Sequence, residues 1–287
     1  QMCIRDRGNN MNYVKNVKNV FRFFKKKEIL PIVHSTEADH LLDGKIVFIT
    51  GGTGGIGQAI AKCMLESGAK VILGGTRQEK IDSSLRHFSQ WKEDVRGIIV
   101  DLANPEAASS VVSSATSLFG KIDIFINSAG VHTEQVDFWN ISIAEYDRVM
   151  KINLRGVFFY CRAVAEYMKT NHVGGNILLI SSSRGSEPAF SPYGISKWGL
   201  NGFTKGLAKE LISDGIIVNG LAPGSTATPL LGFKEGDSIS SDENMLGRLV
   251  LPDEIAEWAK MLVGPSGRMV AGETVLVAGG RGGFDIR

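Results

Sequence analysis

The chain has 287 residues, of which 43% are hydrophobic and 22% charged, a composition typical of globular proteins and too apolar for a disordered one. No apolar run reaches the roughly 18 residues that a membrane-spanning helix needs. Three scattered cysteines, Cys3, Cys63 and Cys161, indicate neither a disulfide framework nor a zinc site, so we expect a reducing, cytoplasmic location. Residues 1–40 hold 8 of the 32 basic and 4 of the 30 acidic residues, which leaves the remainder slightly acidic. This charge balance argues against binding of nucleic acid.

The first 40 residues are predicted to form an extension ahead of a single domain over residues 41–287. Residues 1–10 show no periodicity and precede Met11, so we expect them to be non-native sequence. Residues 13–28 combine apolar side chains at helical spacing with interspersed Lys and Arg, which predicts a basic amphipathic helix. Such a helix could lie on an anionic membrane surface, or it could pack on its own domain or a neighbouring subunit. The residues that follow, up to His40, are interpreted as a linker.

From residue 41 onward, apolar runs of strand length alternate with stretches of helical spacing. The seven predicted strands are Lys45–Thr50, Lys70–Gly75, Val95–Val100, Ile122–Asn127, Asn176–Ser181, Ile216–Leu221 and Glu273–Ala278. The predicted helices begin near Ile56, Gln78, Pro105, Ile143, Tyr193 and Pro252. Because the strands are continuous apolar runs joined by helices, the pattern predicts an α/β fold with a doubly wound parallel sheet of seven strands. A closed eight-stranded barrel is the competing architecture, but it requires an eighth strand–helix unit.

A glycine cluster joins the first predicted strand to the first predicted helix. Gly52, Gly54 and Gly57 have the spacing G-x-G-x-x-G. Glycines let the backbone approach a pyrophosphate closely, and the N-terminus of the following helix offers unpaired N–H groups and a positive dipole. A merely flexible turn is the alternative. The position between a strand and a helix favours dinucleotide binding.

Tyr193 and Lys197 are four residues apart at the start of a predicted helix, so their side chains project from the same face. A nearby cation stabilises tyrosinate and lowers the pKa of the phenol, which lets tyrosine exchange a proton with an alcohol or carbonyl. A Tyr and a Lys on a helix surface are the alternative, since Y-x-x-x-K occurs often by chance. Ser181, Ser182 and Ser183 end the preceding strand, where a hydroxyl could bind a substrate oxygen.

Together these motifs resemble the short-chain dehydrogenase/reductase family over residues 41–287. The segment that starts at Thr50 is similar to the family's cofactor motif T-G-x-x-x-G-I-G, residues 127–130 are similar to its N-N-A-G motif, and Tyr193 with Lys197 is similar to its Y-x-x-x-K motif. The chain departs from the family at three points. Ser replaces the second Asn of N-N-A-G, the interval of 11 residues from serine 182 to tyrosine 193 is shorter than usual, and no acidic residue precedes the final glycines.

The resemblance implies a Rossmann-like fold and an NAD(P)-dependent oxidoreductase that interconverts a secondary alcohol and a ketone by hydride transfer. Tyr193 would be the general acid/base, and Ser182 would hold the substrate oxygen, with Ser183 as the fallback. Lys197 would lower the pKa of Tyr193 and bind the nicotinamide ribose, while Asn153 would anchor a water that relays protons to Lys197. The implied cofactor-binding residues are Gly51, Thr53, Gly55, Ile56, Gly57, Thr76, Arg77, Asp101, Leu102, Asn127, Ala129, Gly130, Tyr193, Lys197, Pro223, Gly224, Thr226 and Thr228.

The end of the second predicted strand bears on the form of the cofactor. NAD-specific relatives usually present Asp or Glu there, whereas this chain has Thr76 and Arg77 and no acidic residue until Glu79. Arg77 could make a forked contact with a 2′-phosphate, and Thr76 could add a hydroxyl. Against this, Gly54 stands where many NADP-dependent relatives carry Arg. The sequence therefore favours NADP(H), with NAD(H) as the alternative.

The substrate is expected to be a small carbonyl or alcohol compound that contacts three segments after strand ends, residues 131–139, 184–192 and 226–249. His132 and Trp139 could contact it, but each is interpreted as structural. A 3-oxoacyl thioester reductase, a hydroxysteroid dehydrogenase and a sugar dehydrogenase all remain open.

Two readings come from other functional classes: a catalytically silent scaffold that binds cofactor, and a membrane-tethered assembly protein that acts through residues 13–28. Apolar side chains on the helical stretches Ile143–Thr170 and Tyr193–Ser213 exceed what one sheet face needs, which predicts a homodimer or homotetramer. The expected location is cytoplasmic, with membrane association as the alternative.

Overall fold

The structure is a computed structural model that describes residues 40–134, 136–234 and 236–283. The chain divides into two units, Gln1–Glu37 and Ala38–Arg287, and the described residues all belong to the second. The amphipathic helix predicted over residues 13–28 lies outside them.

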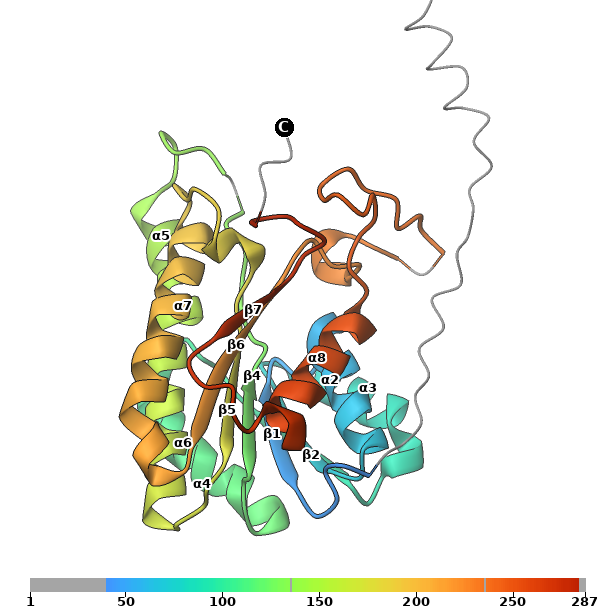
Figure 1. Cartoon of the computed structure of the whole chain (residues 1–287), viewed down its shortest axis with the longest axis vertical. Coiled ribbons are helices and arrows are strands. Elements are labelled where there is room, and N and C mark those ends of the chain that lie inside the picture. Colours follow the sequence, from blue (N-terminus) through green and yellow to red (C-terminus); the bar gives the residue numbers. More distant parts are fainter. Residues whose placement is uncertain (1–39, 135, 235, 284–287) are drawn as a thin grey trace, which may run out of the picture. The chain divides into compact units, whose positions relative to one another are not determined.

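A parallel sheet of seven strands forms the centre of this unit (Figure 1). Its strands are β1 (Ile46–Thr50), β2 (Lys70–Gly75), β3 (Val95–Ile99), β4 (Ile124–Asn127), β5 (Asn176–Ile180), β6 (Ile217–Pro223) and β7 (Thr274–Val277). They lie in the order β3-β2-β1-β4-β5-β6-β7, so the winding reverses between β1 and β4. The predicted doubly wound sheet is confirmed, and the barrel is wrong because β3 and β7 are open edges.

Helices cover both faces of the sheet. Those on one face are α4 (Ala108–Phe119), α6 (Val157–Thr170) and α7 (Pro192–Leu211), with α5 (Ile143–Met150) beside α7 (Figure 1). Those on the other face are α2 (Gly55–Glu66), α3 (Gln78–His87) and α8 (Pro252–Val263) (Figure 1). This arrangement places all helix-to-strand and strand-to-helix turns at the two ends of the sheet.

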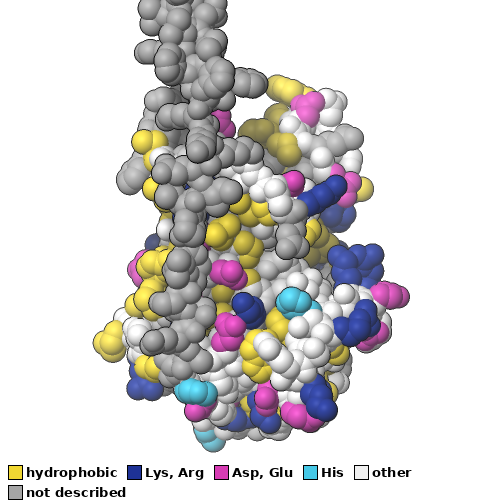
Figure 2. All heavy atoms as spheres, turned by 90° about the vertical axis from the view of Figure 1, so that its right-hand side faces the viewer, with side chains coloured by type: hydrophobic (Ala, Val, Ile, Leu, Met, Phe, Trp, Pro, Cys, Tyr) yellow, Lys and Arg dark blue, Asp and Glu magenta, His cyan; other side chains and the backbone are white. Residues whose placement is uncertain are grey.

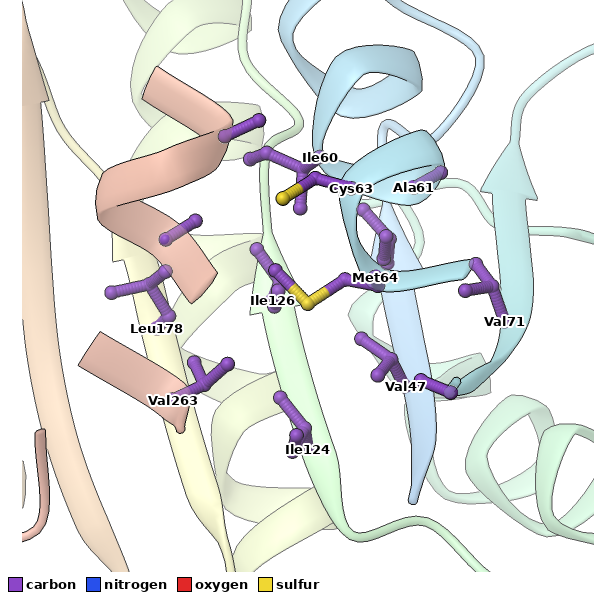
Figure 3. Close-up of a cluster of buried hydrophobic side chains, with 14 of the residues drawn as sticks. Val47, Ile60, Ala61, Cys63, Met64, Val71, Ile124, Ile126, Leu178 and Val263 are labelled. Atoms are coloured by element: carbon purple, nitrogen blue, oxygen red, sulfur yellow. The ribbon is translucent and has the colours of Figure 1, made fainter. Parts of the chain in front are cut away.

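The core consists of two apolar clusters, one on each face of the sheet. Alternate residues of β1 enter different clusters: Val47 packs under α2 and α8, whereas Phe48 packs under α4 and α6. Figure 3 shows the first cluster, in which Ile60 and Met64 of α2 are directed toward Ile126 of β4. Because both faces are covered, successive residues of the central strand β1 are buried on opposite faces, and all five of its residues are buried.

The stretch from Ile143 to Thr170, predicted as continuously helical, contains a π-helical segment, Lys151–Gly156, between α5 and α6. Asn153 in this segment is only 1% exposed, and its side-chain amide exchanges two hydrogen bonds of 2.8 Å with the backbone of Val131. The wider turn lets a polar side chain bond to a neighbouring loop, as π-helical turns at functional sites often do.

On the coloured part of the face drawn in Figure 2, Lys and Arg side chains lie among Asp and Glu side chains, which fits the balanced charge of the sequence after residue 40. The described helices include none whose length and hydropathy would let it cross a membrane.

Candidate active site

The glycine turn lies between β1 and α2. Gly51 has a φ of +70°, and a Cβ at this position would lie 2.6 Å from the backbone nitrogen of Ala129. A Cβ at Gly57 would collide with the carbonyl oxygen of Gly51, so both positions depend on the missing side chain. Helix α2 begins at Gly55 after Gly54, and no side chain caps its N-terminus. An uncapped helix end behind a glycine turn suits a phosphate group.

The ends of the neighbouring strands meet at this turn. Thr50 Oγ1 donates a 2.8 Å hydrogen bond to Asn127 Oδ1, which joins β1 to the N-S-A-G segment. A Cβ at Gly75 would lie 2.9 Å from Thr53 Cγ2, so Thr53 packs over the end of β2. The glycine turn after β1, the N-S-A-G segment after β4 and the end of β2 therefore lie together at the carboxyl end of the sheet.

The residues expected to contact the adenosine part of a dinucleotide follow the carboxyl ends of the next two strands, β2 and β3. Thr76 and Arg77 are exposed after β2, and Arg77 has no ion-pair partner within the described part of the chain. After β3, Asp101 Oδ1 accepts a 2.9 Å hydrogen bond from the Ala103 backbone N–H, and Leu102 is buried. A free guanidinium at the end of β2 fits a cofactor phosphate better than a carboxylate would.

Tyr193 and Lys197 lie on one face at the start of α7. The helix starts at Pro192, and Ser191 caps it by accepting a 3.2 Å hydrogen bond from the backbone N–H of Gly194. Lys197 Nζ lies 5.6 Å from the centroid of the Tyr193 ring and donates a 3.0 Å hydrogen bond to the carbonyl oxygen of Ile180. The cap and the backbone contact fix both side chains at the carboxyl end of β5.

The three serines after β5 have different partners. Ser181 Oγ donates a 2.6 Å hydrogen bond to Asn201 Oδ1, and Ser183 hydrogen-bonds to Glu187. Ser182 makes a side-chain hydrogen bond with Tyr193. The short loop before α7 thus brings Ser182, rather than its neighbours, to the phenol.

Burial governs the protonation of the Tyr–Lys pair. Burial raises the pKa of Tyr193, while the hydrogen bond from Ser182 and the positive charges of Arg184 and Arg281 lower it by a smaller amount. Burial also lowers the pKa of Lys197 to about 8. The expected depression of the Tyr193 pKa by Lys197 is therefore wrong for this structure, because the opposing contributions come from other groups and do not outweigh burial.

Asn153 lies beside this pair. A Cβ at Gly130 would lie 3.4 Å from Asn153 Oδ1 and 3.6 Å from Lys197 Nζ, so Asn153 and Lys197 flank the same glycine. Asn153 Nδ2 also donates a 3.2 Å hydrogen bond to Ser196 Oγ, which in turn donates to the carbonyl oxygen of Tyr193 at 2.7 Å. The π-helical segment is thereby coupled to the first turn of α7.

A cavity of about 470 Å³ opens beside the Tyr–Lys pair. The predicted site residues that line it are Ile56, Gly130, Ser182, Tyr193, Lys197, Pro223, Gly224, Thr226 and Thr228. The other predicted residues lie outside its lining, mainly along the glycine turn and the ends of β2 and β3. All three segments that we expected to contact substrate contribute to the lining.

His132 and Trp139, both interpreted as structural from the sequence, lie in different surroundings: His132 lines the cavity and Trp139 is exposed. The His132 ring stacks on the Tyr193 ring, with centroids 4.3 Å apart and an interplanar angle of 14°, and His132 lines the cavity. Burial and the charges of Lys197 and Arg184 lower the pKa of His132. Trp139 is 87% exposed and lies outside the cavity lining, so it is not part of the core.

One cluster at the cavity is absent from the sequence predictions. Arg281 Nε donates a 2.8 Å hydrogen bond to Glu187, and its guanidinium also contacts Glu243 and Ser225. This cluster ties the C-terminal segment to the loops after β5 and β6. The sequence carries no signal for it, because Arg281 stands alone among glycines and its partners come from distant loops.

Comparison with known proteins agrees with this geometry. The model of the short chain dehydrogenase family matches residues 45–237. The chain is 33% identical over 246 residues to a 3alpha-hydroxysteroid dehydrogenase of Mediterraneibacter gnavus, covering 83% of this chain and 97% of the relative.

Two solved structures are also similar. One is a 3-ketoacyl-(acyl-carrier-protein) reductase from Brucella melitensis complexed with NADH, with a TM-score of 0.76, 30% identity and coverage of 84% of this chain and 99% of that one. Another is a gluconate 5-dehydrogenase from Burkholderia cenocepacia in complex with NADP and tartrate, with a TM-score of 0.78, 29% identity and coverage of 86% and 99%. The chain therefore belongs to the short-chain dehydrogenase/reductase family of NAD(P)-dependent oxidoreductases.

Proposed function

We propose that this protein interconverts a secondary alcohol and a ketone, with Tyr193 as the general acid/base. The observation that supports this most directly is the contact of Tyr193 with Ser182, beside Lys197, in a cavity that opens next to the glycine turn. A phenol that shares a hydrogen bond with a hydroxyl at a cavity wall can hold and protonate a substrate oxygen.

Each residue of the cluster has a distinct role in the proposal. A bound nicotinamide cofactor supplies or accepts the hydride. The hydroxyl of Tyr193 gives a proton to the carbonyl oxygen during reduction and takes it from the alcohol during oxidation, while Ser182 orients that oxygen. Because burial raises the pKa of Tyr193, the phenol is protonated near neutral pH and can serve as the proton donor for reduction.

Lys197 and Asn153 support the proton transfer in this proposal. Lys197 would bind the nicotinamide ribose beside the Tyr193 ring. Asn153, buried next to Lys197, would anchor a water that connects Lys197 to solvent. One hydrogen bond from Asn153 Nδ2 to the Val131 carbonyl oxygen and one from the Val131 N–H to Asn153 Oδ1 hold the amide in place for this role.

The preferred cofactor in this proposal is NADP(H). The support is the exposed Arg77 after β2, together with Thr76 and the absence of an acidic residue at that strand end. We expect Arg77→Ala to raise KM for NADPH about tenfold or more and to leave KM for NADH unchanged, since one charge-assisted contact to the phosphate is lost. Equal losses with both cofactors would show that Arg77 does not read the phosphate.

Turnover of a panel of ketones and alcohols with NADPH and NADH tests the function. The proposal expects oxidation or reduction of at least one compound, with alcohol oxidation accelerating as pH rises and tyrosinate becomes available. Binding of cofactor with no turnover of any compound would favour the silent scaffold instead.

The assembly is proposed to be a homodimer or homotetramer that uses α6 and α7. Phe158 is 45% exposed and its ring packs at a tilt against the Phe203 ring, with centroids 5.2 Å apart, and Trp198 is 50% exposed, so apolar side chains of both helices lie at the surface. Light scattering at micromolar concentration should report a mass of two or four chains; a single-chain mass would contradict this.

Residues 13–28 are proposed to contact an anionic membrane surface from a cytoplasmic location. The support is the basic and apolar pattern of the sequence alone. Binding to anionic vesicles that weakens at high salt is the expected result, and equal binding to neutral vesicles would count against it.

A further inference from the structure

Six large apolar side chains, between 48% and 87% exposed, lie on the loops that contribute to the cavity lining. We call them the apolar rim: Val136, Phe138, Trp139, Phe190, Leu230 and Leu231. They come from three loops, those that follow β4, β5 and β6, and all three loops rise above the same end of the sheet (Figure 1). A cluster of exposed apolar side chains of this kind marks a binding site more often than plain surface.

The apolar rim is continuous with the reacting centre. Val136, Phe190, Leu230 and Leu231 line the same cavity as Tyr193. Phe138 extends this wall outward, since its ring contacts Phe190 edge-on at 6.5 Å and Trp139 at 5.1 Å. A molecule whose oxygen lies at Tyr193 therefore has apolar side chains beside the rest of its length.

The charged groups of the cavity are paired within the protein. Glu187 accepts from Arg184 at 2.9 Å and from Arg281 at 2.8 Å, and Arg281 also contacts Glu243. Burial opposes ionisation of Glu187, but these contacts hold its pKa below the usual range, so the carboxylate stays charged. An anionic substrate would have to compete with these carboxylates for the two arginines.

The remaining titratable groups of the cavity, Lys197 and His132, are poor partners for an anionic substrate. Lys197 is buried, and its Nζ is bound to the carbonyl oxygen of Ile180. Burial and two nearby cations lower the pKa of His132, so its ring is neutral at pH 7. The cavity thus combines an apolar wall with a polar end whose two arginines are already paired with carboxylates.

From this combination we infer that the substrate is an uncharged ketone or secondary alcohol with an extended apolar body, which lies along the apolar rim. The inference rests on the proposed function, because it takes Tyr193 and Ser182 as the site of the reacting oxygen. It excludes substrates that depend on a carboxylate or phosphate beside the reacting carbon.

A series of methyl ketones of increasing chain length, from 2-butanone to 2-decanone, tests this inference at saturating cofactor. Each methylene that leaves water for the rim should raise kcat/KM about two- to fourfold, fourfold corresponding to full burial. A keto acid of the same length as the longest ketone, with a terminal carboxylate, should be at least about tenfold poorer, because a charge on an apolar surface loses hydration without a partner.

A matched pair of variants locates the effect. Phe190→Ala should lower kcat/KM for 2-decanone about tenfold and leave 2-butanone unchanged, because only the long chain reaches this ring. Trp258→Ala is the control, since Trp258 is an exposed aromatic residue on α8 outside the cavity lining. Trp258→Ala should leave kcat/KM unchanged for both 2-decanone and 2-butanone.

The outcomes separate the inference from the proposed function. Turnover of 2-butanone with no gain from longer chains, or a preference for the keto acid, overturns the inference and leaves the proposed function standing. Absence of turnover for every ketone and alcohol, with cofactor still bound, overturns both.

Discussion

Lys197 is a buried amine whose charge depends on pH in the range where the folded protein can be studied. Burial lowers its pKa from 10.5 to about 8, so between these values the unfolded chain binds a proton that the native protein does not. Stability must then rise with pH across this interval, and below about pH 8 the full cost of the buried ammonium is present.

Lys197→Met should remove this dependence. Between pH 8 and pH 10.5, the free energy of unfolding of the wild type should rise by about 3 kcal/mol relative to that of the variant. This is the size implied by the shift of the Lys197 pKa from 10.5 to about 8. Denaturant unfolding of both proteins at a series of pH values measures the difference. Two curves that run parallel across the interval would mean that Lys197 has an ordinary pKa in the folded protein.

At the residue scale, sequence reasoning succeeded where partners are close along the chain. Tyr193 and Lys197 were found because a spacing of four residues places them on one helix face. The stack of His132 on Tyr193 and the contacts of Arg281 with Glu187 could not be found in this way. They depend on how three loops of irregular backbone meet, and no periodicity encodes that.

The role of the glycine turn as a phosphate site can be tested by comparing Gly51 with Gly120. Both glycines have a positive φ, but their surroundings differ. Gly51→Ala should lose cofactor binding and stability, since its Cβ would lie 2.6 Å from the nitrogen of Ala129. Gly120, at the C-terminus of α4, has a φ of +87° and no atom within 4 Å of a Cβ. Gly120→Ala should cost about 1–2 kcal/mol of backbone strain and leave cofactor affinity unchanged.

Cofactor titration and denaturant unfolding of both variants supply the comparison. If Gly51→Ala binds cofactor as well as Gly120→Ala does, the glycine turn is not the phosphate site.

Strands were the most predictable elements of this fold. Most are short runs rich in apolar residues, because residues such as Val47 and Phe48 enter the cores on opposite faces of the sheet. The π-helical segment Lys151–Gly156 could not be predicted, because over six residues the spacing of apolar side chains hardly differs between an α-helix and a π-helix. What distinguishes it is the hydrogen bonding of Asn153 to Val131, 22 residues away.

For the whole molecule, the structure and the family match concern the same part of the chain. The compact unit comprises Ala38–Arg287, and the family model starts at residue 45. Deletion of residues 1–40 should therefore leave the thermal midpoint of unfolding and kcat unchanged, because every contact described for the site lies within the retained residues. Thermal unfolding and steady-state kinetics of the shortened protein measure this. A folded but inactive product would mean that the extension contributes to the active site.

Tyr193→Phe tests whether Tyr193 transfers the proton in the hydride-transfer reaction. The phenyl ring keeps the shape of the side chain and its stacking on His132, but it has no proton to give. Steady-state kinetics with a substrate from the ketone series, together with cofactor titration, should give a kcat at least about 10²-fold lower with cofactor affinity unchanged. A variant that retains the wild-type kcat would show that Tyr193 is not the proton-transferring group.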